Sequence, residues 1–351
     1  MQFSDFAMLE REFETLDRGE ARLNAMRDAV HEADVRQDLN WRFWFRYDYI
    51  EESIFCGDRY YALIMFPELL RLYEESPKLQ EDSRCAHSML VTFKWIVEAA
   101  PEFPQIPREE IDGYFREFRK QLRAQGKSLS AYYMKRSLFY MHVDMDIASM
   151  CFYRFLEEPL DDSSDGQALY YDQQAFYYLW VGAEEKALRA AQPIFDGKVR
   201  ASSLPQATFH DFLRYYMNRG NFEEAERYGR MVEHRVNGDP YYHDIIGSLL
   251  SLYAKLDGAH AIALFNRNVP DYLDSRNPWL RVQFAIGAAH LFAVCREDPA
   301  LYEHFRIPGV SDPRAFGEEI TKAAIDLAKK FDARNGTDDY MQMYLSPYGK
   351  E

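Results

Sequence analysis

A glycine followed five residues later by an alanine recurs at a nearly constant interval along this chain. The three clearest pairs, each 38 residues from the next, are Gly182 with Ala187, Gly220 with Ala225 and Gly258 with Ala263. A glycine commonly ends a helix because it takes a left-handed backbone conformation without steric cost. The alanine then lies on the next helix, where the two helices approach closely. The interval therefore predicts helix-turn-helix hairpins that bury their apolar faces only by stacking on one another.

Weaker copies extend the pattern towards the N-terminus. They are Gly57 with Ala62 and Val143 with Ala148, and the unit around residues 81–125 has a longer turn, at residues 100–107, in place of the glycine. Elsewhere apolar residues recur at spacings of three and four, as at Ile111, Phe115, Phe118 and Leu122. The sequence has no run of alternating Val, Ile and Thr residues that would indicate a strand. We therefore expect an all-α chain.

The most specific unit spans residues 206–240. Its matching residues are Phe209, Leu213 and Tyr216 on the first helix, Gly220, Phe222 and Ala225 at the turn and second helix, and Pro240 at the end. Through these residues the chain resembles the tetratricopeptide repeat (TPR) family, and in particular TPR proteins of bacteria. Looser matches at residues 44–77 and 168–193 extend the resemblance over roughly residues 20–295. It implies a right-handed helical-repeat solenoid of helix-turn-helix hairpins. The family supplies no enzymatic reaction that could be carried over to this chain. Repeat intervals of about 38 to 43 residues, rather than about 34, imply longer helices.

We expect a single domain over residues 1–351. Its expected parts are an N-terminal capping region at residues 1–40, about six TPR-like repeats at residues 41–295, C-terminal capping helices at residues 296–336 and a loosely held tail at residues 337–351. Residues 19–36, 41–55 and 313–333 have the apolar spacing of helices. Pro313 fits the first turn of the last of these, and Gly336 fits the position just after its end.

The composition narrows the possible partners. The chain has 57 acidic and 42 basic residues and a formal net charge of −15, which disfavours nucleic-acid binding because that binding depends on Lys and Arg. No apolar run approaches the roughly 20 residues of a membrane helix; the run at Tyr60–Phe66 is far shorter. The N-terminus has neither the basic nor the apolar region of a signal peptide. The four cysteines are far apart, without a CxxC motif. We expect a soluble, cytoplasmic protein without membrane contact.

The resemblance implies a ligand groove lined by the first helix of each unit. The groove positions carried over from the family are Trp44, Tyr47, Tyr133, Tyr140, Asp172, Phe176, Trp180, His210, Arg214 and Asn218. Aromatic side chains supply contact area and polar groups fix the register of an extended or helical peptide. The leading hypothesis is thus a non-catalytic scaffold that binds a peptide or protein partner in its concave face. The alternative for these aromatic residues is packing between long helices.

A basic stripe is a second candidate surface. Its residues, spaced as one face of a helix, are Arg116, Arg119, Lys120, Arg123 and Lys127. Such a stripe suits an acidic partner or a phosphate group, and the alternative is an ordinary solvated helix face.

One motif suggests metal chemistry. Asp161, Asp162 and Asp165 match the DDxxD pattern of magnesium-dependent all-α enzymes, but Pro159 and Gly166 flank them and predict a loop. The sequence has no HExxH, GxSxG, GxGxxG or P-loop motif, so we expect neither a cofactor nor a metal. Two further hypotheses remain: an all-α enzyme using these aspartates, and a peptide-responsive signalling regulator. The first 40 residues are too short for a DNA-binding domain in such a regulator. The sequence does not indicate an oligomeric state.

Overall fold

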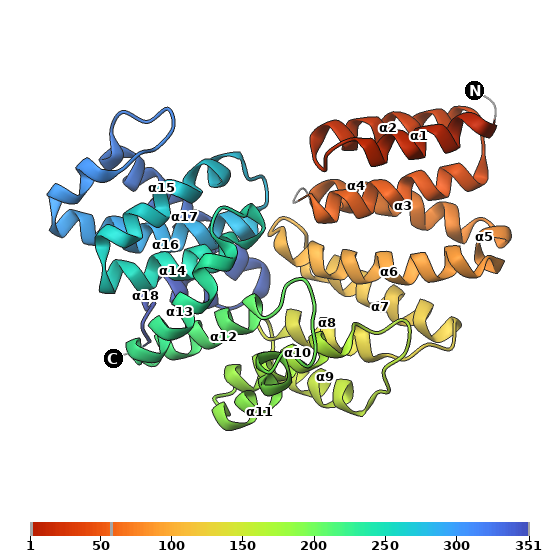
Figure 1. The fold of residues 1–351 in the computed structure, drawn as a ribbon. Coiled ribbons are helices and arrows are strands. Elements are labelled where there is room, and N and C mark those ends of the chain that lie inside the picture. The colour runs from red at the N-terminus through yellow and green to blue at the C-terminus, as the bar shows by residue number, and fades with distance from the viewer. Residues whose placement is uncertain (1–2, 57–58, 350–351) are drawn as a thin grey trace. The chain divides into compact units, whose positions relative to one another are not determined.

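The computed structural model describes residues 3–56 and 59–349 (Figure 1). Helices make up 78% of the chain, and the described residues contain no strand, which confirms the all-α prediction. Gly57 of the predicted repeat lies outside the described residues. The chain divides into two compact units, each described here by itself. Unit 1 comprises Met1–Tyr140 and Asp146–Ser164, and unit 2 comprises Met141–Met145 and Asp165–Glu351. The single domain stays a prediction.

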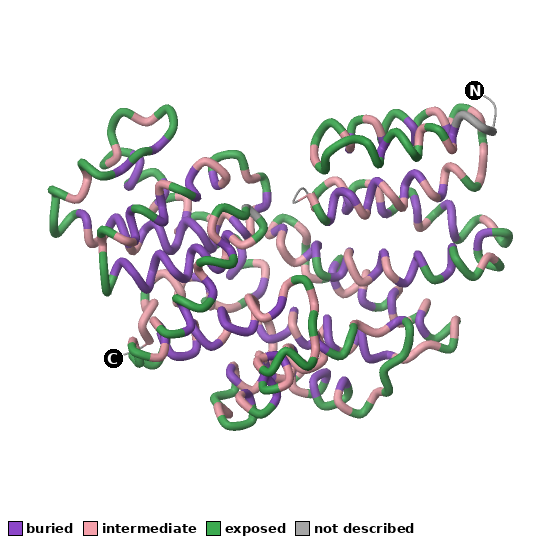
Figure 2. The backbone as a smooth tube through the Cα atoms, viewed as in Figure 1, coloured by how far each residue is buried: buried purple, intermediate pink, exposed green. Residues whose placement is uncertain are grey.

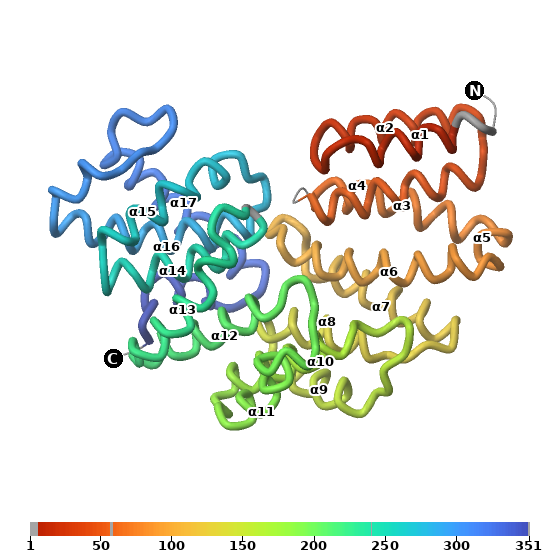
Figure 3. The backbone as a smooth tube through the Cα atoms, in the orientation of Figure 1, coloured from red at the N-terminus to blue at the C-terminus, as the bar shows by residue number. Residues whose placement is uncertain are grey.

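Unit 1 contains the first nine α-helices in chain order (Figure 3). They are α1 (Phe3–Thr15), α2 (Glu20–Val35), α3 (Leu39–Phe55), α4 (Arg59–Glu74), α5 (Pro77–Glu81), α6 (Ser83–Ala99), α7 (Arg108–Ala124), α8 (Ser130–Tyr140) and α9 (Met145–Glu157), with a short 3₁₀ helix, η1 (Ala100–Glu102). Helices α2 and α3 confirm the two helices predicted here. Phe66, Phe93 and Phe118 form the centre of the unit, with ring centroids 5.0 and 5.9 Å apart along the series. Aromatic residues therefore fill the space between its long helices.

Unit 2 contains the remaining helices. They are α10 (Gln167–Trp180), α11 (Glu184–Phe195), α12 (Gln206–Met217), α13 (Phe222–Val236), α14 (His243–Leu256), α15 (Gly258–Asp274), α16 (Pro278–Glu297), α17 (Pro313–Asn335) and α18 (Asp339–Leu345), with 3₁₀ helices η2 (Pro240–Tyr242) and η3 (Pro299–His304). Consecutive helices pack in pairs, and α10, α12, α14 and α16 also contact one another in sequence. Helix α17 confirms the predicted last long helix, and Gly336 ends it with a left-handed φ of 75°.

Two of the three clearest glycine–alanine pairs have the predicted conformation. Gly182 and Gly220 have φ values of 76° and 67° between paired helices. Ala187 and Ala225 have no exposed surface, because a neighbouring helix packs against each of them.

The third pair differs from the prediction. Gly258 is the first residue of α15, and Asp257 turns the chain with an extended backbone and accepts the His260 amide hydrogen bond at 3.0 Å. This N-cap replaces a left-handed glycine. Ala263 is exposed and Ala261 is the buried alanine, so the predicted register is wrong at this turn.

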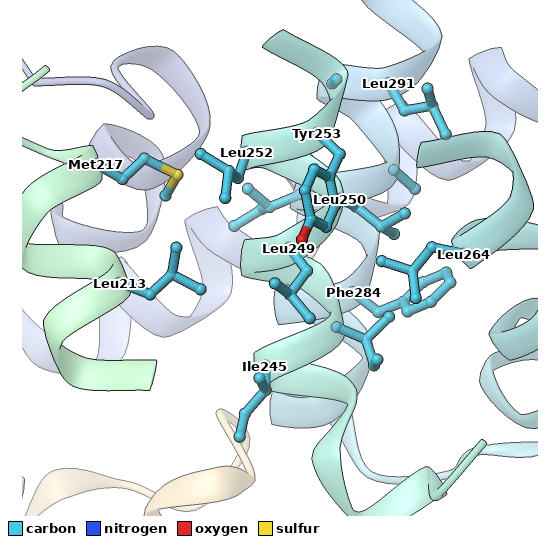
Figure 4. Packing of buried hydrophobic residues seen from close by; sticks show 14 of the residues in the cluster. Leu213, Met217, Ile245, Leu249, Leu250, Leu252, Tyr253, Leu264, Phe284 and Leu291 are labelled. Atoms are coloured by element: carbon cyan, nitrogen blue, oxygen red, sulfur yellow. The ribbon is translucent and has the colours of Figure 1, made fainter. Parts of the chain in front are cut away.

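Helices α14 and α16 cross in backbone contact. A Cβ atom on Gly247 would lie 2.2 Å from the Gln283 carbonyl oxygen, and one on Gly287 would lie 2.0 Å from the Gly247 carbonyl oxygen. Both distances are shorter than any real Cβ contact, so only glycine fits at these two positions. Figure 4 shows apolar side chains of α12, α14, α15 and α16 packed together in the core of unit 2, with Leu252 of α14 facing Met217 of α12.

Helix α16 is both long and strongly apolar. Pro278–Glu297 is long and apolar enough to cross a membrane by length and composition, so the expectation that no apolar stretch approaches that length is wrong. However, 67% of its most apolar stretch is buried inside the structure. Figure 2 draws most of this helix in purple, the colour of buried residues. Helices α14, α15 and α17 all pack against it. Its apolar surface is thus accounted for by its position in the core of unit 2.

The C-terminal end is held more firmly than the sequence predicts. Helix α18 packs on α16 and α17, and Tyr340 is buried with its ring stacked on Phe331 at a centroid distance of 4.7 Å. The Asp332 carboxylate accepts hydrogen bonds from the amides of Tyr340 and Met341, each at 2.9 Å. The expectation of a loose tail is therefore wrong for residues 337–349, because a carboxylate from α17 caps α18 and an aromatic ring anchors it.

Candidate functional site

A pocket of about 350 Å³ lies in unit 2 between α10, α12 and the C-terminal end of the chain. Helix α10 supplies Phe176 and Trp180, and α12 supplies Asp211, Arg214 and Asn218. These residues come together because each set follows the three- and four-residue spacing of one helix face. The two faces meet because α10 and α12 pack against each other as first helices of neighbouring hairpins.

One wall of the pocket is aromatic. The Trp180 and Phe176 ring centroids are 5.9 Å apart, and the His142 imidazole lies edge-on to Trp180 at 4.8 Å. The Nδ1 atom of His142 is 3.3 Å from an Asp339 carboxylate oxygen on α18. This contact joins His142 to α18, and both residues line the pocket. The wall offers flat apolar surface suited to a planar or aliphatic group.

Two arginines from α12 and its C-terminal turn line the pocket. The Arg219 guanidinium lies over the Tyr215 ring at 3.7 Å, which fixes its position by a cation–π contact. Arg214 has a different environment: its Nη2 atom is 3.7 Å from the Met343 sulfur, a weak hydrogen-bond acceptor, and the described residues place no carboxylate in an ion pair with it. Because a guanidinium carries five N–H donors, Arg214 retains hydrogen-bonding capacity towards a ligand.

Behind Arg214 lies a group of acidic residues with altered protonation. Burial raises the pKa of Asp172 to about 6, an effect opposed by a hydrogen bond of 2.5 Å from the Thr208 hydroxyl. Burial also raises the pKa of Asp211 well above its ordinary value, and the nearby Asp172 carboxylate adds to this rise while Arg214 opposes it. The Asp172 carboxyl is therefore mostly ionised at pH 7 and gains its proton as the pH falls through about 6. The negative charge that faces Arg214 thus decreases at lower pH.

His210 lies in the same layer but inside the protein. Its Nε2 atom is 2.8 Å from the Ser248 hydroxyl, and its Nδ1 atom is 3.7 Å from an Asp244 oxygen. Burial lowers the pKa of His210 well below its ordinary value, and the charge of Arg214 acts in the same direction. A neutral imidazole at this position links α12 to α14 and has only 6% of its surface exposed.

The ten predicted groove residues divide between the two units. Phe176, Trp180, Arg214 and Asn218 line the pocket of unit 2, while Asp172 and His210 lie in the polar layer behind it. The four remaining residues, Trp44, Tyr47, Tyr133 and Tyr140, belong to unit 1.

The unit 1 residues have partners of their own. Trp44 and Tyr47 are half-buried and meet edge to face at 5.8 Å, and Tyr133 packs against Tyr132 at 5.0 Å. Tyr140 is only 2% exposed, and its hydroxyl donates a hydrogen bond of 2.6 Å to Asp112. Tyr140 therefore packs between helices, which was the alternative to a place in the groove.

Sequence reasoning missed several pocket residues. Asp211 lies three residues before Arg214 on the same helix face, so its spacing was a usable signal. Arg219 follows the helix, and His142 lies in the segment between α8 and α9, where helical spacing carries no information. The tail residues Asp339 and Met343 had no signal at all, because tertiary packing places them here.

The basic stripe is partly neutralised in the structure. Lys120 pairs with Glu117 at 2.9 Å, and Lys127 pairs with Asp162 at 2.7 Å. Arg119 is half-buried with its guanidinium 5.8 Å from the centre of the Tyr132 ring. Arg116 and Arg123 are exposed on α7. The stripe thus presents two exposed arginines rather than five free cations.

The acidic motif lies in the predicted loop, between α9 and α10. The Asp161 carboxylate accepts hydrogen bonds from the Ser163 amide at 2.9 Å, the Ser163 hydroxyl at 2.6 Å and the Ser128 amide at 2.7 Å. These contacts lower the pKa of Asp161 although its burial acts in the opposite direction. Asp161 thus organises the loop, and Asp162 binds Lys127 as stated above.

The described residues contain no group of three or more His, Cys, Asp or Glu side chains arranged to hold a metal ion. The pocket of unit 2 instead combines aromatic faces, an arginine with spare donors and acidic groups with raised pKa values. Comparison with protein-family models, with curated proteins and with solved structures finds no match to this chain.

Proposed function

We propose that unit 2 is a right-handed, tetratricopeptide-like solenoid that binds a peptide or protein partner without catalysis. In this proposal α10/α11, α12/α13, α14/α15 and α16/α17 are the hairpins, and their first helices form the binding face. The pairwise packing of these helices and the contacts between successive first helices support it. The observation that carries the proposal is the convergence of Phe176, Trp180, Arg214 and Asn218 from two hairpins on one pocket.

The pocket suggests the chemistry of the bound segment. Its volume of about 350 Å³ suits one or two side chains of a peptide rather than a whole folded surface. Phe176 and Trp180 would contact an aromatic or aliphatic side chain, and Arg214 would bind a neighbouring carboxylate with two parallel hydrogen bonds. We therefore expect a partner segment in which an acidic group lies next to an apolar side chain.

The test is selection of peptides from a random display library on the full-length chain, followed by titration of the selected peptides. Arg214→Glu should weaken binding by about 30-fold or more, which corresponds to about 2 kcal/mol, because it replaces an attractive charge by a repulsive one. Trp180→Ala should weaken binding as well, through loss of the aromatic wall. Melting curves check that each variant is folded.

The matched control is Arg123→Glu, an exposed arginine of the basic stripe with the same change of charge. It should leave binding of the selected peptides almost unchanged. If Arg123→Glu abolishes binding while Arg214→Glu retains it, the basic stripe is the working surface and the proposal is wrong.

A further inference from the structure

The chain's own C-terminal segment, residues 339–349, forms one side of the proposed binding face. Asp339, Gln342 and Met343 of this segment line the pocket beside α10 and α12. A second, smaller pocket lies between Met343, Pro347 and the helices α12, α14 and α16. The segment therefore runs along the same first helices to which the proposed function assigns the partner.

The segment makes specific contacts with the inner helices. His290 of α16 donates a hydrogen bond of 2.8 Å from Nε2 to the Tyr344 carbonyl, and the two rings stack with centroids 6.0 Å apart. The Tyr348 hydroxyl donates a hydrogen bond of 2.8 Å to the backbone carbonyl of Ser251 on α14. The Tyr348 ring also lies edge-on to Phe222 at 5.5 Å. These are the contact types by which a bound peptide is held: main-chain hydrogen bonds with aromatic side chains between them.

The end of the segment reaches α12 at close range. A Cβ atom on Gly349 would lie 2.1 Å from the Asn218 carbonyl oxygen, and Gly349 has a left-handed φ of 87°. Asn218 is one of the residues that line the pocket. The position therefore admits glycine alone as long as the segment is docked.

Burial changes abruptly within the segment. Tyr340 is 4% exposed and belongs to the core of unit 2, whereas residues 341–349 are all half-buried or exposed. Leu345, for example, is 61% exposed on the outer side of α18. Release of residues 341–349 would uncover the first helices while Tyr340 keeps its place on Phe331. It would open the pocket on the side formed by Gln342 and Met343, and it would remove the partly buried Tyr344 and Tyr348 from the surface of the core. Because these side chains are not fully buried, the segment can open at a lower free-energy cost than the core itself.

We propose that residues 341–349 are an internal occupant of the peptide-binding face, and that the external ligand is a peptide of similar chemistry that displaces them. This inference rests on the proposed function. The segment reads Met-Gln-Met-Tyr-Leu-Ser-Pro-Tyr-Gly and has no acidic residue, and it places the Met343 sulfur, a weak acceptor, at Arg214. The ligand class is therefore a short peptide with aromatic and thioether side chains, and an acidic group in the place of Met343 would strengthen its binding to Arg214. Because the internal copy is tethered, its effective concentration is on the order of millimolar. An external peptide therefore binds weakly until the internal copy is loosened.

The experiment uses the full-length chain and a fluorescein-labelled synthetic peptide with the sequence of residues 341–349. The loosened variant combines Tyr348→Ala, which removes the hydrogen bond to Ser251, with Gly349→Ala, which places a Cβ against Asn218. The matched control is Leu345→Ala, an exposed residue of the same segment. Fluorescence anisotropy should give a Kd for the loosened variant at least about tenfold lower than for wild type or the control. Hydrogen exchange at residues 341–349 should rise in the loosened variant alone.

Each other outcome contradicts the inference. Equal affinity of the peptide for wild type and the loosened variant means that the internal segment does not compete. Absence of peptide binding to a variant whose segment exchanges rapidly means that the segment does not represent the ligand. Unchanged exchange in the double variant means that the segment is a fixed part of the fold. In all three cases the display-selected peptides and Arg214→Glu still test the proposed function separately.

Discussion

At the scale of single residues, the charge of the site depends on the protonation of two carboxyl groups. Asp172 and Asp211 are placed behind an arginine but in surroundings that disfavour their charged forms. A carboxyl group that keeps its proton on burial still accepts a hydrogen bond and can also donate one. The polar layer can therefore take up protons as the pH falls, which reduces the negative charge beside Arg214.

The raised pKa of Asp172 has a consequence for stability. The folded state holds this proton more tightly than the unfolded chain, since burial raises the pKa from 3.8 to about 6. The free energy of unfolding should therefore fall as the pH rises from about 4 to about 6. Asp172→Asn keeps an acceptor for the Thr208 hydroxyl but cannot ionise. It should raise the free energy of unfolding at pH 7 by about 1–3 kcal/mol and flatten this part of the pH profile. Urea unfolding at pH 4, 5, 6 and 7 measures both effects, and a less stable variant at pH 7 would contradict them.

At the scale of helices, one of the repeated alanines lies in a close helix contact and another shares only the spacing in the sequence. Ala225 is fully buried on α13, and Ala263 occupies the equivalent place in the sequence pattern but is exposed on α15. Ala225→Leu should lower the free energy of unfolding by about 1–3 kcal/mol, because three added carbon atoms must enter a packed interface. Ala263→Leu is the matched control and should change it by less than about 0.5 kcal/mol. Thermal and urea unfolding of the pair gives the comparison. Equal effects at both positions would contradict the assigned packing.

The crossing of α14 and α16 gives a second test at this scale. Gly247→Ala should lower the free energy of unfolding by about 2 kcal/mol or more, since its Cβ would meet the Gln283 backbone and not a movable side chain. Gly113→Ala on α7 is the matched control, because the nearest atom there is the end of Arg116 at 3.6 Å. In the control, alanine should stabilise the helix by about 0.5–1 kcal/mol. Opposite signs for the two substitutions are the expected result, and a neutral Gly247→Ala would rule out backbone contact.

The periodicity of the sequence predicted the helices and part of the pocket, but it did not predict the contacts between distant segments. The turn glycines Gly182 and Gly220 were predictable because a left-handed residue leaves a local signature. Gly258 shares the spacing but not the conformation, because an aspartate N-cap can make the same turn. In the sequence, Gly247 and Gly287 resemble any other helical glycine, because only the position of the partner helix shows that no larger residue fits. The docking of residues 339–349 depends on such placement as well, so helical spacing could not predict it.

At the scale of the whole molecule, the chain divides into two compact units. Phe93 is fully buried in unit 1, and Leu249 is fully buried in unit 2. Phe93→Ala should destabilise unit 1 by about 3–5 kcal/mol. Leu249→Ala should destabilise unit 2 by about 2–5 kcal/mol. Calorimetry with hydrogen exchange should then show loss of protection confined to the substituted unit. If both substitutions lower protection equally throughout the chain, the units unfold as one cooperative body.

The backbone contact between Gly247 and Gly287 also constrains how this chain can vary over generations. Every nucleotide change that alters the meaning of a glycine codon either introduces a residue with a Cβ or stops translation. No single step from either glycine therefore leads to a residue that fits, and a compensating change at the other position cannot help because that residue is already the smallest. Both glycines must therefore be kept together, and the two helices keep their close spacing while exposed positions of the same helices can vary.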